Sequence, residues 1–150
     1  MRAGTQVLTD YSQDFNKQDL CKNLALNQIQ QKAQVIFAVA GQCGLGALNA
    51  AKENGLWGVG VDKDQSFLGS YILTSAVKRV DIGVYTTIKK AKNRTYRGGS
   101  DLVFNLKNNG VALGKISPRL SKKIRTTVLA KVAVLRRQII SGKIKPPKSF

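Results

Sequence analysis

The sequence predicts an α/β fold built around a parallel β-sheet, because strand-like and helix-like segments alternate along its first half. A continuous apolar run at 35–39 has the length of a strand that is buried on both faces. An alanine-rich helical segment at 47–54 follows, and it leads into a second strand-like run at 57–61. This order predicts a right-handed parallel unit, and ligands bind such sheets at the carboxyl edge of the strands.

Three further helices are predicted from apolar residues that recur at helical spacing. The first covers 17–31 and has Asn16 as its predicted cap, and the second covers 76–92. The third begins near Pro118 and ends before Gly142. Its predicted buried stripe consists of Leu120, Ile124, Val128, Leu135 and Ile139.

Short strands complete the predicted fold. Alternating residues indicate one strand at 5–9, and an apolar run indicates another at 71–74. Residues 102–106 and 111–113 flank an Asn-Asn-Gly turn, a pattern typical of a β-hairpin.

The length and apolar content indicate a single domain. The chain has 150 residues, of which 43% are hydrophobic, and this is enough for one core. No apolar run approaches the roughly 18 residues of a membrane span. Residues 1–6 lack the apolar segment of a signal peptide, so we expect no export or anchoring signal in this chain itself.

Positive charge is concentrated in the second half of the chain. The formal net charge is +17, from 25 basic and 8 acidic residues. Residues 1–75 carry six of each kind, so the other 19 basic and two acidic residues lie in 76–150. Such asymmetry is compatible with nucleic acid or an anionic membrane as a partner, and equally with a solvated basic surface.

Two cysteines and the absence of histidine limit the chemistry that the chain can perform. Two cysteines do not make a disulfide framework, so we predict small, buried side chains at Cys21 and Cys43, and their redox state stays open. Without histidine, a Cys/His metal site and an imidazole general base are both missing. We therefore expect a protein without enzyme activity, metal or cofactor.

Four segments, taken in order, carry a resemblance to a known family. They are Val-Ile-Phe-Ala-Val-Ala-Gly at 35–41, Gly-Leu-Gly at 44–46, Gly-Val-Asp-Lys-Asp-Gln at 60–65 and Ile-Leu-Thr-Ser-Ala-Val-Lys-Arg-Val-Asp at 72–81. As a set they resemble the basic membrane proteins, which are lipoprotein solute-binding components of ABC transporters for purine nucleosides. The resemblance extends from about Arg2 to Lys145.

This resemblance implies a three-layer, parallel-sheet lobe of a two-lobed, periplasmic-binding-protein-like (type I) fold, of which the chain resembles only the second half. It implies a lobe core at 1–75, a basic crossover helix at 76–98 that packs on the first lobe, and a hairpin and helix at 99–150 that complete the lobe. It also implies a lipoprotein on the extracytoplasmic face of the cell membrane, with ABC permease subunits as partners. An uncovered apolar face on the crossover helix would favour a homodimer.

The resemblance assigns a purine nucleoside to the cleft between the lobes and its ribose hydroxyls to Asp62 and Lys78. A carboxylate accepts two hydroxyl hydrogen bonds and an ammonium donates to a hydroxyl or ring oxygen, so the pair suits a sugar. Ala40 and Gly41 match a turn whose small residues approach the ligand, and Phe15 resembles an aromatic that stacks on it. Base recognition belongs to the first lobe, so we expect weak nucleoside binding, or none, by this chain alone.

The residues themselves leave simpler roles open. Asp62 suits a cap on the following turn, Lys78 a solvated surface charge, and Phe15 a core aromatic. Ala40 and Gly41 suit an ordinary strand-to-helix connection.

Two classes of function follow. The first is a solute-binding component of an ABC importer for purine nucleosides. The alternative is a basic nucleic-acid-binding or transcription-regulatory protein built on the same lobe, because the excess positive charge lies in 76–150. The sequence has neither a helix-turn-helix pattern nor an aromatic-interleaved basic strand, so a nucleic-acid partner is the less expected one.

Overall fold

The structure, a computed structural model, describes residues 4–99 and 101–146. The predicted lobe core at 1–75 and the predicted final region at 99–150 include residues 1–3, 100 and 147–150, which lie outside the described residues. The helices are α1 (Gln18–Gln30), α2 (Gly44–Glu53), α3 (Val80–Lys92) and α4 (Lys122–Ile140). The strands are β1 (Val35–Phe37), β2 (Trp57–Asp62), β3 (Ile72–Lys78) and β4 (Val111–Leu113), and a short 3-10 helix, η1 (Ser66–Leu68), precedes β3.

The four strands form one sheet in the order β1-β2-β3-β4. The pairs β1–β2 and β2–β3 are parallel, and β4 joins the free edge of β3 in antiparallel orientation. The carboxyl ends of β1, β2 and β3 therefore meet at one edge of the sheet. The predicted α/β class with a predominantly parallel sheet is confirmed.

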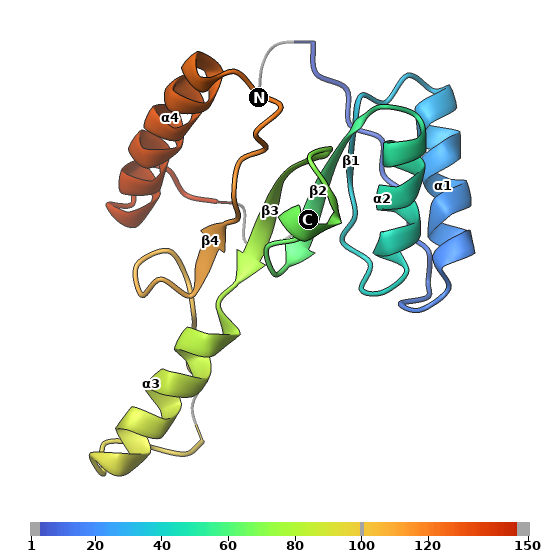
Figure 1. The fold of residues 1–150 in the computed structure, drawn as a ribbon. Coiled ribbons are helices and arrows are strands. Elements are labelled where there is room, and N and C mark those ends of the chain that lie inside the picture. The colour runs from blue at the N-terminus through green and yellow to red at the C-terminus, as the bar shows by residue number, and fades with distance from the viewer. Residues whose placement is uncertain (1–3, 100, 147–150) are drawn as a thin grey trace.

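The core lies between the sheet and the pair α1 and α2, which pack side by side (Figure 1). Small residues allow this close approach, since a Cβ built on Gly46 would overlap the carbonyl oxygen of Gln18. The largest fully buried apolar side chains are Leu48 on α2 and Ile72 at the start of β3. The central strand β2 also carries two buried glycines, which let α2 and β3 approach it.

The two later helices contribute nothing to this core. In Figure 1, α4 lies on the other side of the sheet from α1 and α2, and α3 extends away from the sheet. Neither helix contains a buried residue. The predicted buried stripe of the last helix is therefore wrong, because Ile124 and Leu135 are 49% and 48% exposed. Helical spacing identifies the apolar face of a helix but does not supply an element to cover it.

The boundary between β3 and α3 also differs from the prediction. The strand continues to Lys78, because Val61 pairs with Ala76 on one side and Leu113 pairs with Ala76 on the other. The helix begins only at Val80. Pairing on both edges of β3 extends the strand beyond what its local pattern indicates.

Two predicted strands are not formed. Residues 5–9 adopt no strand conformation, although they line a cavity beside β1. Residues 102–106 are likewise not a strand, so the predicted hairpin is wrong. The predicted turn is present, with the amide of Gly110 donating to the carbonyl of Asn105 at 2.8 Å, but β4 pairs with β3. The open edge of β3 offers a longer partner than the 102–106 segment does.

Candidate ligand-binding site

Asp62 and Lys78 end neighbouring parallel strands and meet at the carboxyl edge of the sheet. The Nζ of Lys78 lies 3.1 Å from Oδ1 of Asp62. Asp62 is directly opposite Val77 in the β2–β3 register, so Lys78 is one residue further along. Their side chains are 54% and 69% exposed, and an ion pair with this exposure adds little to stability. The structure thus brings these two predicted residues together where a ligand can reach both.

The backbone of Asp62 has an unusual conformation. Its φ is +66°, in the left-handed region that aspartate tolerates better than most residues. The chain turns sharply here, since the amide of Lys63 donates to the carbonyl of Val61 at 2.8 Å. Such conformations cluster at functional sites and require support from surrounding contacts.

That support comes from two buried polar residues that the sequence analysis missed. The side-chain oxygen Oε1 of Gln65 accepts from the amide of Val61 at 3.1 Å. The amide of Gln65 in turn donates to Oγ of Ser75 at 3.0 Å. Gly60 makes room for both, because a Cβ there would lie 2.7 Å from the Ser75 hydroxyl. The one sequence signal for them was a glutamine and a serine beside otherwise apolar strands.

Phe15, Ala40 and Gly41 form a second group on the same edge, after β1. A Cβ built on Gly41, whose φ is +57°, would lie 3.2 Å from the carbonyl oxygen of Phe15. The Phe15 side chain is 73% exposed, so its alternative role as a core aromatic is wrong. Phe15 and Ala40 line a cavity of about 1140 Å³ beside β1, whereas Asp62 and Lys78 do not. The five predicted residues therefore lie on one open edge in two groups.

Cys21 and Cys43 form a disulfide, a redox state that the sequence left open. Their Cα atoms are 5.5 Å apart, although 22 positions separate them in the sequence. Cys21 lies in the first turn of α1, and Cys43 directly precedes α2. The crossing of the two helices brings them together, and spacing in the sequence gave no sign of it. Both cysteines are buried, as predicted.

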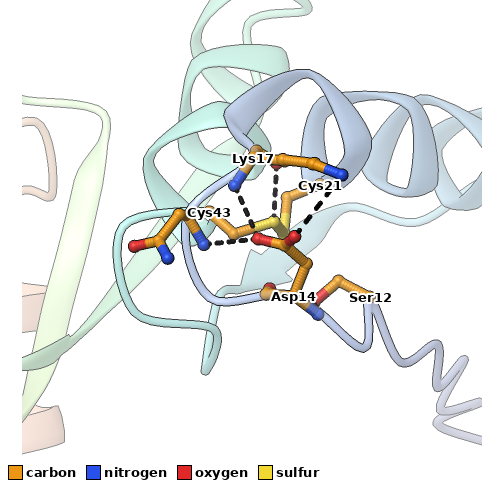
Figure 2. Close-up of polar contacts among 6 residues, drawn as sticks. Ser12, Asp14, Lys17, Cys21 and Cys43 are labelled. Atoms are coloured by element: carbon orange, nitrogen blue, oxygen red, sulfur yellow. Dashed lines mark hydrogen bonds and ion pairs between the residues drawn. A yellow bond between two sulfur atoms is a disulfide. The ribbon is translucent and has the colours of Figure 1, made fainter.

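The loop that carries Phe15 is held by Asp14 (Figure 2). Oδ1 of Asp14 accepts hydrogen bonds from the amides of Asn16 and Lys17 at 2.7 and 2.8 Å. The bonds from Lys17 and Asn16 lower the pKa of the Asp14 carboxyl below its usual value. Asp14, and not the predicted Asn16, therefore satisfies the amides that precede α1.

The chemistry of this edge is that of reversible polar binding. The predicted residues supply a carboxylate, an ammonium, an exposed aromatic ring and a glycine turn. Within 4–99 and 101–146, no group of three or more His, Cys, Asp or Glu residues could hold a metal ion. None of the helices in those same ranges is long and apolar enough to cross a bilayer.

Comparison with known sequences identifies relatives over almost the whole chain. The sequence model of a family described as "ABC transporter substrate-binding protein PnrA-like" matches residues 3–149. A CD4+ T-cell-stimulating antigen of Listeria monocytogenes is 32% identical over 95% of this chain and 44% of its own length. Basic membrane protein D of Borreliella burgdorferi is 33% identical over 95% and 42%. An ABC transporter nucleoside-binding protein of Lactococcus lactis is 30% identical over 98% and 45%.

Solved structures agree with this assignment. A solute-binding protein of an ABC transporter system from Aeropyrum pernix matches with a TM-score of 0.74 and 28% identity, over 97% of this chain and 50% of its own. A transcriptional activator of the comK gene from Bacillus halodurans matches with a TM-score of 0.74 and 25% identity, over 91% and 47%. The chain spans less than half the length of the curated relatives it matches. The chain belongs to the PnrA-like family of ABC transporter substrate-binding proteins.

Proposed function

We propose that this chain forms one lobe of an extracytoplasmic protein that binds purine nucleosides for an ABC importer. The observation that carries the proposal is the exposed Asp62–Lys78 pair, 3.1 Å apart at the carboxyl edge of the parallel sheet. The Asp62 carboxylate accepts hydrogen bonds from the vicinal ribose hydroxyls, and the Lys78 ammonium donates to a hydroxyl or to the ring oxygen. The two charged groups already lie within reach of each other, so one ligand can contact both.

Phe15 and Gly41 complete this half of the site in the proposal. The exposed Phe15 ring is available to stack on a flat base or on a ribose face. Ala40 and Gly41 are small residues, which suit a turn whose backbone a ligand approaches. The name of the Lactococcus lactis relative, a nucleoside-binding protein, supports the choice of ligand.

The proposal also gives α3 a partner. Val80, Val84 and Ile88 recur at helical spacing on α3 and are 62%, 54% and 62% exposed. We expect this face to pack on a first lobe that closes the site over the ligand, or on a second copy of this chain when that lobe is absent. ABC permease subunits are the partners expected for the complete binding protein.

The disulfide supports an extracytoplasmic location. Disulfides such as Cys21–Cys43 form and persist in oxidising compartments and are rare in reducing ones. The name of the Borreliella burgdorferi relative, a basic membrane protein, agrees with a position at the membrane. A lipoprotein anchored on the outer face of the cell membrane fits both observations.

Titration by two-dimensional NMR tests the proposal on the chain alone, because this method detects weak binding. Inosine, guanosine or adenosine is expected to shift the amides around Asp62, Lys78 and Gly41, with a dissociation constant on the order of millimolar. The free base hypoxanthine, which lacks ribose, is expected to cause much smaller shifts near Asp62 and Lys78. Equal shifts with base and nucleoside would contradict the assigned ribose contacts.

A pair of variants completes this test. Asp62→Ala is expected to abolish the nucleoside-induced shifts, because it removes the carboxylate that accepts from the ribose. Glu53→Ala is the matched control, since Glu53 also makes an exposed ion pair, at 2.9 Å with Lys22, but between α1 and α2. Unchanged affinity in the Asp62→Ala variant would refute the proposed function.

A further inference from the structure

We propose that the Cys21–Cys43 disulfide is a positioning element of the ligand-facing edge: it fixes the turn at 40–43 against the loop at 12–17, so that Gly41 and Phe15 present one preformed surface. The role of that surface in binding rests on the proposed function. The fixing of the turn does not, and it can be measured without a ligand.

Figure 2 shows the Cys21–Cys43 crosslink beside Asp14 and Lys17, on either side of Phe15 in the sequence. Cys43 is fully buried and Cys21 is 4% exposed, while Phe15 is 73% exposed. The Sγ of Cys43 lies 2.9 Å from the carbonyl oxygen of Lys17, the residue that caps α1. One covalent bond therefore ties the turn before α2 to the point where the 12–17 loop enters α1.

Cys43 also contacts Phe15 directly. The amide of Cys43 donates to the carbonyl oxygen of Phe15 at 2.9 Å. Gly41, two residues earlier, has a Cα whose added Cβ would lie 3.2 Å from that same oxygen. The backbone of Phe15 is thus held by the turn, and the turn is held by the disulfide.

Asp14 holds the other end of the loop. Its carboxylate accepts from the amides of Asn16 and Lys17, and Ser12 donates its hydroxyl to the carbonyl of Asp14 at 2.7 Å. Phe15 therefore lies between a polar clamp on its own loop and a covalent clamp behind the turn. Its ring is largely exposed, so burial does little to fix it.

The α1–α2 pair does not need the disulfide to stay together. Gly46 packs against the backbone of Gln18, and Ala25 and Ala47 are buried between the elements of the core. Apart from Cys43, the turn and the loop are only partly buried or exposed, and exposed segments with few apolar contacts open locally more often than the core does. A crosslink at this place therefore restricts the site more than it restricts the helices, and a site ordered before binding loses less entropy on binding.

Amide hydrogen exchange measured by NMR on the 150-residue chain tests the inference. In the C21A/C43A double variant, hydrogen exchange at the amide of residue 43 is expected to accelerate. This acceleration should be at least about tenfold larger than that of the α2 amides at 48–51. Leu48→Ala is the control, because it destabilises the core while keeping the disulfide, and residue 43 should then keep its local protection. A second double variant, C21V/C43A, fills more of the space left by the two sulfurs in case the first does not fold.

The outcomes separate the inference from the proposed function. If residue 43 exchanges no faster in the double variants than in Leu48→Ala, the disulfide does not position the turn and the inference is wrong. If its exchange accelerates, nucleoside titration shows the consequence: the shifts at Phe15 and Gly41 should weaken in the double variant and persist in Leu48→Ala. If the unmodified chain shows no nucleoside shifts at all, the half-site of Asp62 and Lys78 does not bind nucleoside by itself, while the exchange data still decide the role of the disulfide.

Discussion

The two halves of this chain differ in how their helices are covered. Every buried hydrophobic side chain among the described residues lies between Cys21 and Ile72. The helices α3 and α4, which follow, contain no buried residue and expose Val84, Ile88, Ile124 and Leu135. Both halves have amphipathic helices, so the difference lies in what stands opposite them. The first half encloses its own core, whereas the apolar faces of the second half have no cover among the described residues.

Charge follows the same division. The first 75 residues are formally neutral, and the excess of positive charge lies after them. Self-repulsion among many like charges opposes compaction, so the basic half gains less from folding onto itself. We infer that the first half determines the stability of the isolated chain and that the second half determines its associations.

Truncating one leucine in each half gives the largest expected contrast. Leu48→Ala removes a side chain that is 1% exposed, and it is expected to lower the free energy of unfolding by about 2–5 kcal/mol. Leu135→Ala, at 48% exposure on α4, is expected to cost about 0.5 kcal/mol or less. Urea denaturation followed by circular dichroism measures both. Similar losses for the two variants would show that α4 belongs to the same core.

A pair of glycine substitutions sharpens the contrast at the level of backbone contact. Gly46→Ala places a methyl group against the carbonyl of Gln18 and is expected to destabilise the chain by about 1–3 kcal/mol. Gly98→Ala, after α3, meets no atom within 4 Å, and its effect should stay within about 0.5 kcal/mol. Thermal unfolding of the two variants tests this. A tolerated alanine at Gly46 would mean that α1 and α2 can separate without loss.

Lowering the pH is expected to have the smallest effect on stability, and this effect should be confined to local structure. Asp14 has a lowered pKa because the amides of Lys17 and Asn16 donate to it, and Asp81 has one because Arg79 does. A lowered pKa means stability that is present at neutral pH and lost as pH falls below the usual value of 3.8 and through the folded-state pKa. NMR titration should show the amides of Asn16 and Lys17 losing their hydrogen bonds in this range. In Asp14→Ala these amides should exchange fast already at neutral pH, and unchanged protection would contradict the role of Asp14.

The fold and half of the site were accessible from the sequence for identifiable reasons. Continuous apolar runs and alanine-rich spacing indicate the parallel unit of β1, α2 and β2, because burial on two faces leaves a local pattern. The positions of Asp62 and Gly41 follow from that unit, since residues after parallel strands share one edge. Local pattern could not show that β3 continues to Lys78. It also could not show that β4 pairs with β3 and not with residues 102–106, because strand pairing depends on which edge of the sheet is free.

The sequence by itself determined the α/β class, the carboxyl edge as the place of the candidate site, and the uneven charge. Each of these depends on composition or on spacing between near neighbours. Tertiary structure alone decided that Cys21 and Cys43 are bonded, that Asp14 holds the loop of Phe15, and that α3 and α4 have no cover among the described residues. Each of these depends on which distant segments meet in space, and amphipathic spacing records only that a face is apolar, not what lies against it.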